Sequence, residues 1–312
     1  MSRGDWAEAY APASVGNVAV GFDLLGQALV GAGDRVRVRR VAGAAVRVSA
    51  ICGTVLDLPR DCQRNTAARA VAALLRAQAA DFGVDIEIEK GIPLGSGMGG
   101  SAASAVAALV AANALLAQPL PLPALYPFAL EGEFAASGGY HGDNVAPSLL
   151  GGLVLATHSG CLALPVPAGL SCLLLHPDLV VETRRARACL QAPYAIADFV
   201  AQAEALALFL CGLERADLRL IGAGLRDVLV EPRRAHLIPG FAAVKQALLD
   251  HAALGASISG AGPSVFGWFA TAAAAAAATS DALAAFAGAG LSATALLSPV
   301  AAPGARLEAC AA

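Results

Sequence analysis

The first half of the chain alternates between strand-like and helix-like segments. Strands are predicted where apolar and polar residues alternate with a period of two, at residues 6–12, 35–41 and 84–90. Residues 65–82 carry leucine, alanine and valine at helical spacing, which predicts an amphipathic helix. A glycine-rich loop at 91–101 leads into helices predicted at 99–117 and 122–136, and the latter ends at Gly138.

The second half has the same mixed character. Strands are predicted at residues 151–156, 170–176, 254–259, 264–269 and 291–297. Helices are predicted at residues 194–213, 239–251 and 271–287, the last of them alanine-rich. A turn-rich segment with Pro165 and Pro167 separates the halves. The chain is therefore predicted to be an α+β protein with two domains, 1–163 and 164–312.

Hydrophobic residues make up 57% of the 312 residues, so a membrane protein has to be considered. The longest uncharged stretch, 91–130, is interrupted by glycines at its start, by Asn113, and by prolines at 119, 121, 123 and 127. Its alanine-rich centre, 102–117, is shorter than the roughly 20 apolar residues that a spanning helix needs. The first six residues lack the apolar core of a signal peptide. We therefore expect a cytoplasmic protein with no membrane partner.

Charge and cysteine content exclude further classes of partner. The net charge of −3 argues against nucleic acid as a ligand. Only Lys90 and Lys245 are lysines, so recognition of anions must depend on arginine. The seven cysteines are scattered without a C-x-x-C pair, which predicts neither a disulfide framework nor a zinc site.

The glycine-rich loop at 91–104 carries the clearest chemical signal. Its G-x-G-x-x-G pattern lacks the acidic residue about 20 positions later that a dinucleotide-binding fold requires, since none occurs before Glu131. No G-K-[ST] follows either, and a merely structural turn remains an alternative. Free N–H groups at the start of the following helix suit a phosphate, and Ser101 and Ser104 lie one turn apart there. A loop without lysine depends more on Mg²⁺.

Three motifs, spread over almost the whole chain, resemble those of the GHMP kinases (galactokinase, homoserine kinase, mevalonate kinase and phosphomevalonate kinase). They are P-L-G-S-G-M-G-G-S-A-A at 93–103, A-P-A-S-V-G-N-V-A-V-G-F-D-L-L-G at 11–26, and S-G-A-G-P-S at 259–264. Gly100 replaces the first serine of the usual central motif. The resemblance implies an N-terminal ribosomal-protein-S5-like domain that binds ATP and a C-terminal ferredoxin-like α+β domain.

The same resemblance implies which residues hold ATP. These are Pro93, Leu94, Gly95, Ser96, Gly97, Met98, Gly99, Gly100, Ser101, Ala102, Ala103 and Ser104. Asn65, which opens a helix, is either an adenine-pocket residue or a helix cap. Ser101 and Glu133 are expected to bind Mg²⁺, while Glu131, two positions away on the helix, should face elsewhere.

Within the family, the sequence is most similar to the members that phosphorylate L-homoserine in threonine biosynthesis. The similarity lies in the N-terminal motif, in G-G-Y-H-G-D-N-V-A-P-S-L-L-G-G at 138–152, in T-R-R-A-R at 183–187, and in E-P-R-R-A-H-L-I-P-G-F at 231–241. It implies a substrate pocket formed by Asn17, Asp23, His141, Asn144, Thr183, Arg187 and Arg234. Arg187 and Arg234 would bind the substrate carboxylate, and Asp23 its ammonium group.

The catalytic residues implied are Asn144, Ser101 and Glu133. Related enzymes place an aspartate where this chain has Asn144, and the neighbouring Asp143 is expected to point away. We therefore expect direct in-line transfer, with Asn144 positioning the acceptor hydroxyl. An L-threonine kinase and a non-catalytic ligand-binding relative remain alternatives, and we expect a homodimer.

Overall fold

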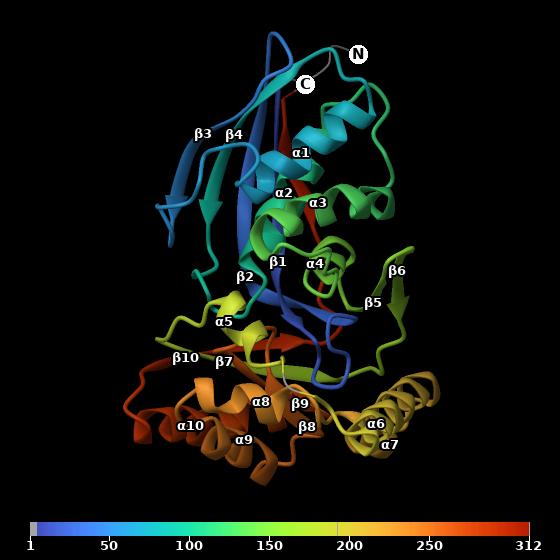
Figure 1. Cartoon of the computed structure of the whole chain (residues 1–312), viewed down its shortest axis with the longest axis vertical. Helices are drawn as coiled ribbons and strands as arrows, with labels where there is room; N and C mark the ends of the chain where they lie inside the picture. The colour runs from blue at the N-terminus through green and yellow to red at the C-terminus, as the bar shows by residue number, and fades with distance from the viewer. Residues whose placement is uncertain (1–4, 192, 312) are drawn as a thin grey trace.

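The computed structural model describes residues 5–191 and 193–311. Of the first six residues, which were predicted to lack the apolar core of a signal peptide, residues 1–4 therefore lie outside it. Two β-sheets with their helices form an upper and a lower half (Figure 1). The α+β prediction is confirmed. All seven cysteines lie in the described residues and are free in this structure.

The upper sheet has seven strands. They are β1 (Trp6–Gly16), β2 (Leu25–Val41), β3 (Val46–Gly53), β4 (Gly83–Lys90), β5 (Leu153–Thr157), β6 (Gly160–Leu164) and β11 (Arg306–Cys310). Five of them run in the order β11-β1-β2-β4-β3, and β5 pairs with β2 and β6. The predicted strands exist, with β1 and β2 longer than expected. The strands β3, β6 and β11 were not predicted.

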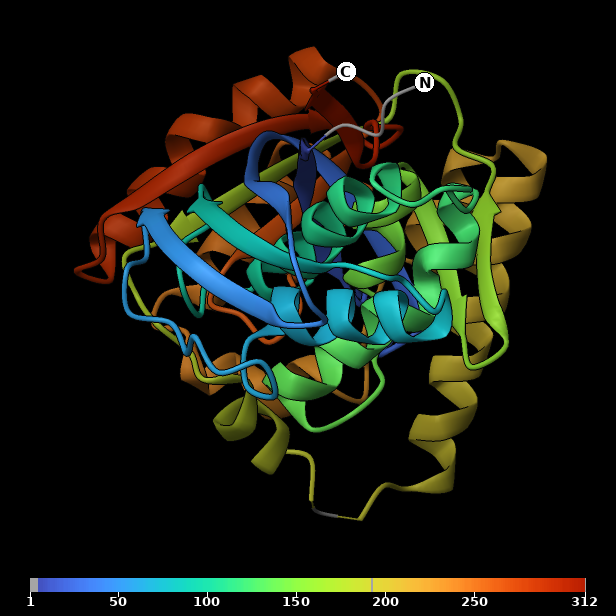
Figure 2. The same ribbon diagram turned by 90° about the horizontal axis from the view of Figure 1, so that it is seen from above.

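Helices cover one face of the upper sheet (Figures 1 and 2). They are α1 (Thr66–Ala77), α2 (Gly100–Ala114), the 3₁₀ turn η1 (Leu122–Leu125), α3 (Tyr126–Ser137) and α4 (Val145–Leu150). Nearly all of α2 is buried, because alanine lets it pack closely against β1, β2, α1 and α3. The helix α1 ends earlier than predicted, and Ala79 just beyond it has a left-handed φ of 45°.

The lower sheet has four antiparallel strands in the order β10-β7-β9-β8. They are β7 (Ser171–Pro177), β8 (Gly255–Ile258), β9 (Val265–Phe269) and β10 (Ala293–Pro299). The helices α9 (Phe241–Asp250) and α10 (Ala272–Gly288) pack on this sheet. The remaining helices are α5 (Thr183–Ala188), α6 (Ile196–Arg215), α7 (Leu218–Gly224), α8 (Glu231–Arg234) and the 3₁₀ turn η2 (Ala235–Leu237).

The two halves share part of one core. Phe209, Phe266 and Trp268 of the lower half belong to the same buried cluster as the upper sheet. The Trp268 indole N–H also donates to Gln27 Oε1 of β2 at 2.7 Å. The last strand, β11, returns to pair with β1, so a division at residues 163 and 164 separates the sheets except for this strand and the last residue of β6, Leu164.

Among the described residues, α6 is long and apolar enough to cross a membrane by length and composition alone. A single helix of this kind is weak evidence for a membrane segment. In this fold α6 packs against α7, and the side chain of its Gln202 donates to the carbonyl of Val20 in the upper half.

Candidate active site

A cavity of about 830 Å³ lies where the two halves meet. Its walls come from the glycine-rich loop, the β1–β2 loop, α3, the α3–α4 segment, α5, Arg234 and the turn after β8. Of the residues that the sequence predicted for the site, only Ala103 is not part of this wall, because its side chain is buried in the core. Segments far apart in sequence therefore converge on one site.

The glycine-rich loop presents its backbone to the cavity with its carbonyl groups turned away. The carbonyls of Ser96, Gly97 and Met98 accept from the hydroxyls of Ser264 at 2.6 Å and Ser259 at 2.7 Å, and from the N–H of Ser14 at 3.0 Å. The motif at residues 259–264, which supplies Ser259 and Ser264, therefore fixes the carbonyl side of the loop. With these carbonyls engaged, backbone N–H groups at the start of α2 are left for an anion.

The cation nearest this loop lies beneath it and is already paired. Lys90 is buried and its ammonium group contacts the Asp34 carboxylate and donates to the Gly100 carbonyl at 2.8 Å. The Ser104 hydroxyl donates to the same carboxylate at 2.6 Å. Of the two serines at the start of α2, Ser101 is therefore the one whose hydroxyl has no such commitment.

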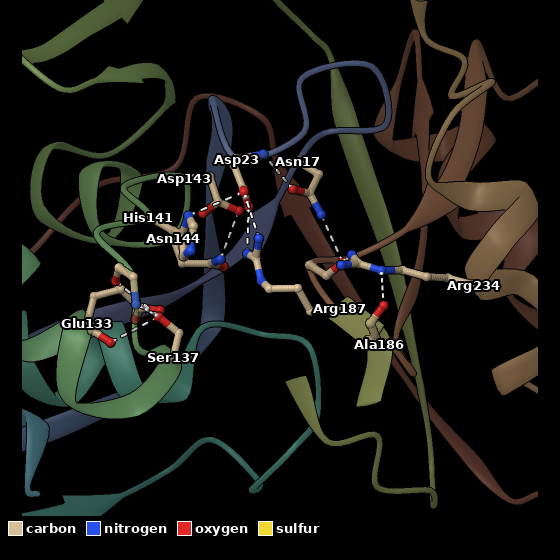
Figure 3. A network of polar contacts seen from close by, with 12 residues as sticks. Asn17, Asp23, Glu133, Ser137, His141, Asp143, Asn144, Ala186, Arg187 and Arg234 are labelled. Atoms are coloured by element: carbon tan, nitrogen blue, oxygen red, sulfur yellow. Dashed lines mark hydrogen bonds and ion pairs between the residues drawn. The ribbon is translucent and has the colours of Figure 1, made fainter. Parts of the chain in front are cut away.

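At the other end of the cavity, the Asp23 carboxylate is held by the Arg187 guanidinium and the His141 imidazole (Figure 3). The Arg187 guanidinium donates to both of its carboxylate oxygens at 3.0 Å, and His141 Nδ1 lies 3.3 Å away. Burial alone would raise the pKa of Asp23, but hydrogen bonds from His141 and Arg187 lower it to about 2. Two residues predicted to hold opposite charges of the substrate are thus paired with each other.

Arg234 occupies a buried position next to this pair. Its guanidinium donates to the carbonyls of Ala186 at 3.1 Å and Gly260 at 3.2 Å. Burial and the nearby Arg187 both lower the pKa of Arg234. The centre of the Phe22 ring, which the sequence did not single out, lies 5.5 Å from the Arg187 guanidinium and 5.2 Å from that of Arg234. Arg187 and Arg234 therefore place two positive charges beside the carboxylate of Asp23.

Asn144 lies between the two ends of the cavity. Its Oδ1 accepts from the Ser14 hydroxyl at 2.8 Å, and its Nδ2 donates to Asp143 Oδ2 at 3.0 Å. The expectation that Asp143 points away is wrong, because this buried carboxylate is part of the cavity wall. Both residues face the cavity because Asn144 is the N-cap of α4 and Asp143 belongs to the turn before that helix. Burial and the nearby Asp23 raise the pKa of Asp143 to about 6.

Glu133 of α3, which the sequence predicted to bind Mg²⁺, lies in the cavity wall. Burial raises its pKa to about 8, and its carboxylate makes no ion pair among the described contacts. It lines the same cavity as Ser101, so the two residues fit the predicted Mg²⁺ site. No group of three metal-binding side chains occurs in the described part of the chain. Phosphate oxygens and water would supply the other ligands.

Two of the remaining predicted residues, Asn65 and Thr183, line the cavity at the starts of helices. Asn65 is the N-cap of α1, since its Oδ1 accepts from the Ala68 N–H at 3.1 Å, while its Nδ2 donates to the Pro59 carbonyl at 2.7 Å. Thr183 opens α5 at the cavity wall. Glu131 is not part of this wall and pairs with Arg69, in keeping with the expectation that it faces elsewhere.

Comparisons with known proteins agree with this architecture. The family model for the GHMP kinase N-terminal domain matches residues 65–152, and that for the C-terminal domain matches residues 205–288. The homoserine kinase of Xanthomonas campestris is 58% identical over 301 residues, which is 96% of this chain and 94% of that protein. The homoserine kinase of Xylella fastidiosa is 56% identical over the same shares.

A crystal structure gives the same answer for the fold. The homoserine kinase of Cytophaga hutchinsonii is 40% identical and superimposes with a TM-score of 0.94 over 99% of both chains. With two domain models, close relatives over most of its length and a matching experimental structure, the chain belongs to the GHMP kinase family.

Proposed function

We propose that this ATP-dependent kinase transfers the γ-phosphate of ATP to the side-chain hydroxyl of L-homoserine, giving O-phospho-L-homoserine and ADP. The observation that carries the proposal is the acceptor end of the cavity, where Asp23 and Asp143 lie beside Arg187 and Arg234. The ammonium group of a small zwitterionic alcohol suits the two carboxylates, and its carboxylate suits the two guanidinium groups. The Asp23–Arg187 pair can stay intact, since each carboxylate oxygen has further lone pairs for an ammonium group.

Transfer in this arrangement needs no strong base. Asn144 presents one remaining lone pair and one remaining N–H to the acceptor hydroxyl, which fixes the attacking oxygen. The N–H groups at the start of α2 receive the phosphate charge. Glu133 and Ser101 would hold Mg²⁺, which supplies neutralisation of charge on the transferred phosphate. In a loose transition state the hydroxyl loses its proton late.

An ADP-release assay with a panel of acceptors tests the substrate. We expect turnover with L-homoserine and much less with L-threonine, and none with mevalonate, which carries no ammonium group. N-acetyl-homoserine and homoserine methyl ester each remove one charge, and both should lose at least about tenfold in kcat/KM. Equal activity with the methyl ester would contradict recognition of the carboxylate.

The role of Asn144 is tested separately. Asn144→Ala should lower turnover far more than affinity for ATP, and unchanged turnover would rule this role out. If the protein is instead a non-catalytic ligand-binding relative, ATP will bind to the wild type without any ADP release. The cytoplasmic location and the homodimer remain predictions, to be checked by fractionation and by sedimentation.

A further inference from the structure

The loop between β1 and β2, which carries Asp23, has an unfavourable backbone. Asn17, Val18, Ala19 and Asp23 have φ values of 69°, 41°, 56° and 58°. Side chains of L-residues disfavour this left-handed region, and β-branched valine does so most. A loop of this kind keeps its shape only when contacts from outside determine it.

Besides the Phe22 ring, which lies beside two guanidinium groups of the lower half, three polar side-chain contacts link this loop to the lower half of the molecule. Asn17 Nδ2 donates to the Gly260 carbonyl at 2.8 Å, and Arg187 pairs with Asp23. The third comes from α6, where Gln202 Nε2 donates to the Val20 carbonyl at 2.8 Å. Asn17, Asp23 and Arg187 belong to the candidate site itself, whereas Gln202 is not part of the cavity wall.

The oxygen of the Gln202 amide binds the segment that leads to Arg234. Its Oε1 accepts from the Val228 N–H at 2.9 Å. Val228 follows Asp227, whose carboxylate caps the turn into α8 by accepting from the N–H groups of Val230 and Glu231. That short helix ends at Arg234. One side-chain amide thus joins the loop of Asp23 to the segment of Arg234.

We propose that Gln202 is a positioning residue for the amino-acid substrate, which it never touches. By donating to the loop of Asp23 and accepting from the segment of Arg234, it sets the distance between these two residues at the acceptor end. A glutamine amide carries a donor and an acceptor on separate atoms, so one side chain can bind both segments at once. The inference rests on the proposed function, because it concerns the pocket for a zwitterionic acceptor.

The substitution Gln202→Glu tests this with almost no change in shape. The introduced carboxylate still accepts from the Val228 N–H, but it faces the Val20 carbonyl without a proton to donate. We expect KM for homoserine to rise about tenfold, with KM for ATP unchanged within about twofold. The penalty relative to wild type should shrink as the pH falls and the introduced carboxyl gains a proton. Gln202→Met, which removes both contacts, should raise KM for homoserine at least as much at every pH.

Gln246→Glu is the matched control, because Gln246 is also a helix residue with one side-chain contact, to the exposed Asp250. It should leave both KM values unchanged. Equal KM values for homoserine in wild type and in both Gln202 variants would overturn the proposal, as would a parallel rise in KM for ATP. If homoserine is not the substrate, the wild type itself fails with it, and the Gln202 comparison is then made with whichever amino-acid alcohol it phosphorylates.

Discussion

The two ends of the cavity differ in the kind of chemical group that lines them. The phosphate end is backbone, fixed by three serines that bind successive carbonyls of the loop, and its nearest cation is paired beneath it. The acceptor end is made of charged side chains, with two carboxylates and two guanidinium groups around a strained loop. The phosphate end should therefore be sensitive to steric change, and the acceptor end to changes of charge.

The largest effect is expected from a methyl group in the glycine-rich loop. A Cβ at Gly97 would lie 2.5 Å from the Ser259 carbonyl oxygen and 2.7 Å from that of Gly262. Since both are backbone atoms, the loop itself must move, and Gly97→Ala should reduce kcat/KM for ATP by more than roughly 10³-fold. Steady-state kinetics and ATP titration measure this loss.

Gly95→Ala is the control for backbone strain. Its φ of 62° is as left-handed as the 74° of Gly97, but its Cβ would meet only the exposed Val180 side chain, which can rotate. Strain of about 1–2 kcal/mol applies to both variants. Equal losses of activity would show that strain, and not the contact with the Ser259 turn, decides the behaviour of this loop.

A charge deletion at the acceptor end should have the next largest effect. Arg187→Ala leaves Asp23 without its bidentate partner and removes a cation for the substrate carboxylate. We expect kcat/KM for homoserine to fall roughly 10²–10³-fold, with ATP binding retained. The control is Arg185→Ala on the same short helix, whose side chain is exposed, and it should behave as wild type. Loss of ATP binding by Arg187→Ala would contradict the division between the two ends.

Asp143 separates stability from activity at the acceptor end. Its pKa of about 6, raised from 3.8 by burial and by the nearby Asp23, means that the folded state binds the proton more tightly than the unfolded state. The charged form thus destabilises the fold above pH 6, and this cost disappears as the pH falls from 6 to below 4. Asp143→Asn should stabilise the protein at pH 8 by up to about 3 kcal/mol.

Urea unfolding at pH 8 and pH 4 measures that difference, which should be much smaller at the lower pH. An asparagine at position 143 can still accept from Asn144, so turnover should fall less than about tenfold. A loss of 10³-fold or more would instead identify Asp143 as a general base and contradict direct transfer.

Sequence reasoning reached the phosphate end more completely than the acceptor end. The glycine loop and the helix after it are local features, because glycine content and helical periodicity are visible within 25 residues. The ion pair between Asp23 and Arg187 joins residues 164 positions apart, and no local pattern indicates it. Asp143 was expected to point away, but adjacent side chains face opposite ways in a strand and need not do so in the turn before a helix.

The same distinction explains the elements that were missed. The strand β11 is defined by its pairing with β1, almost 300 residues earlier, and α4 and α5 have only six residues each. Such short helices carry too few turns for a hydrophobic period to show, and tertiary contacts form them.

The smallest predicted effect concerns Asn65, for which the sequence left two roles open. The cap contact to the Ala68 N–H makes this side chain part of the scaffold, although the residue also lines the cavity near the phosphate end. Asn65→Ala should cost about 1 kcal/mol of stability with KM for ATP unchanged within about twofold. Asn65→Asp keeps the cap acceptor but loses the donor to the Pro59 carbonyl, so it separates the two contacts. A rise in KM for ATP in the alanine variant at full stability would assign Asn65 to the nucleotide, and the phosphate end would then depend on a side chain as well as on backbone.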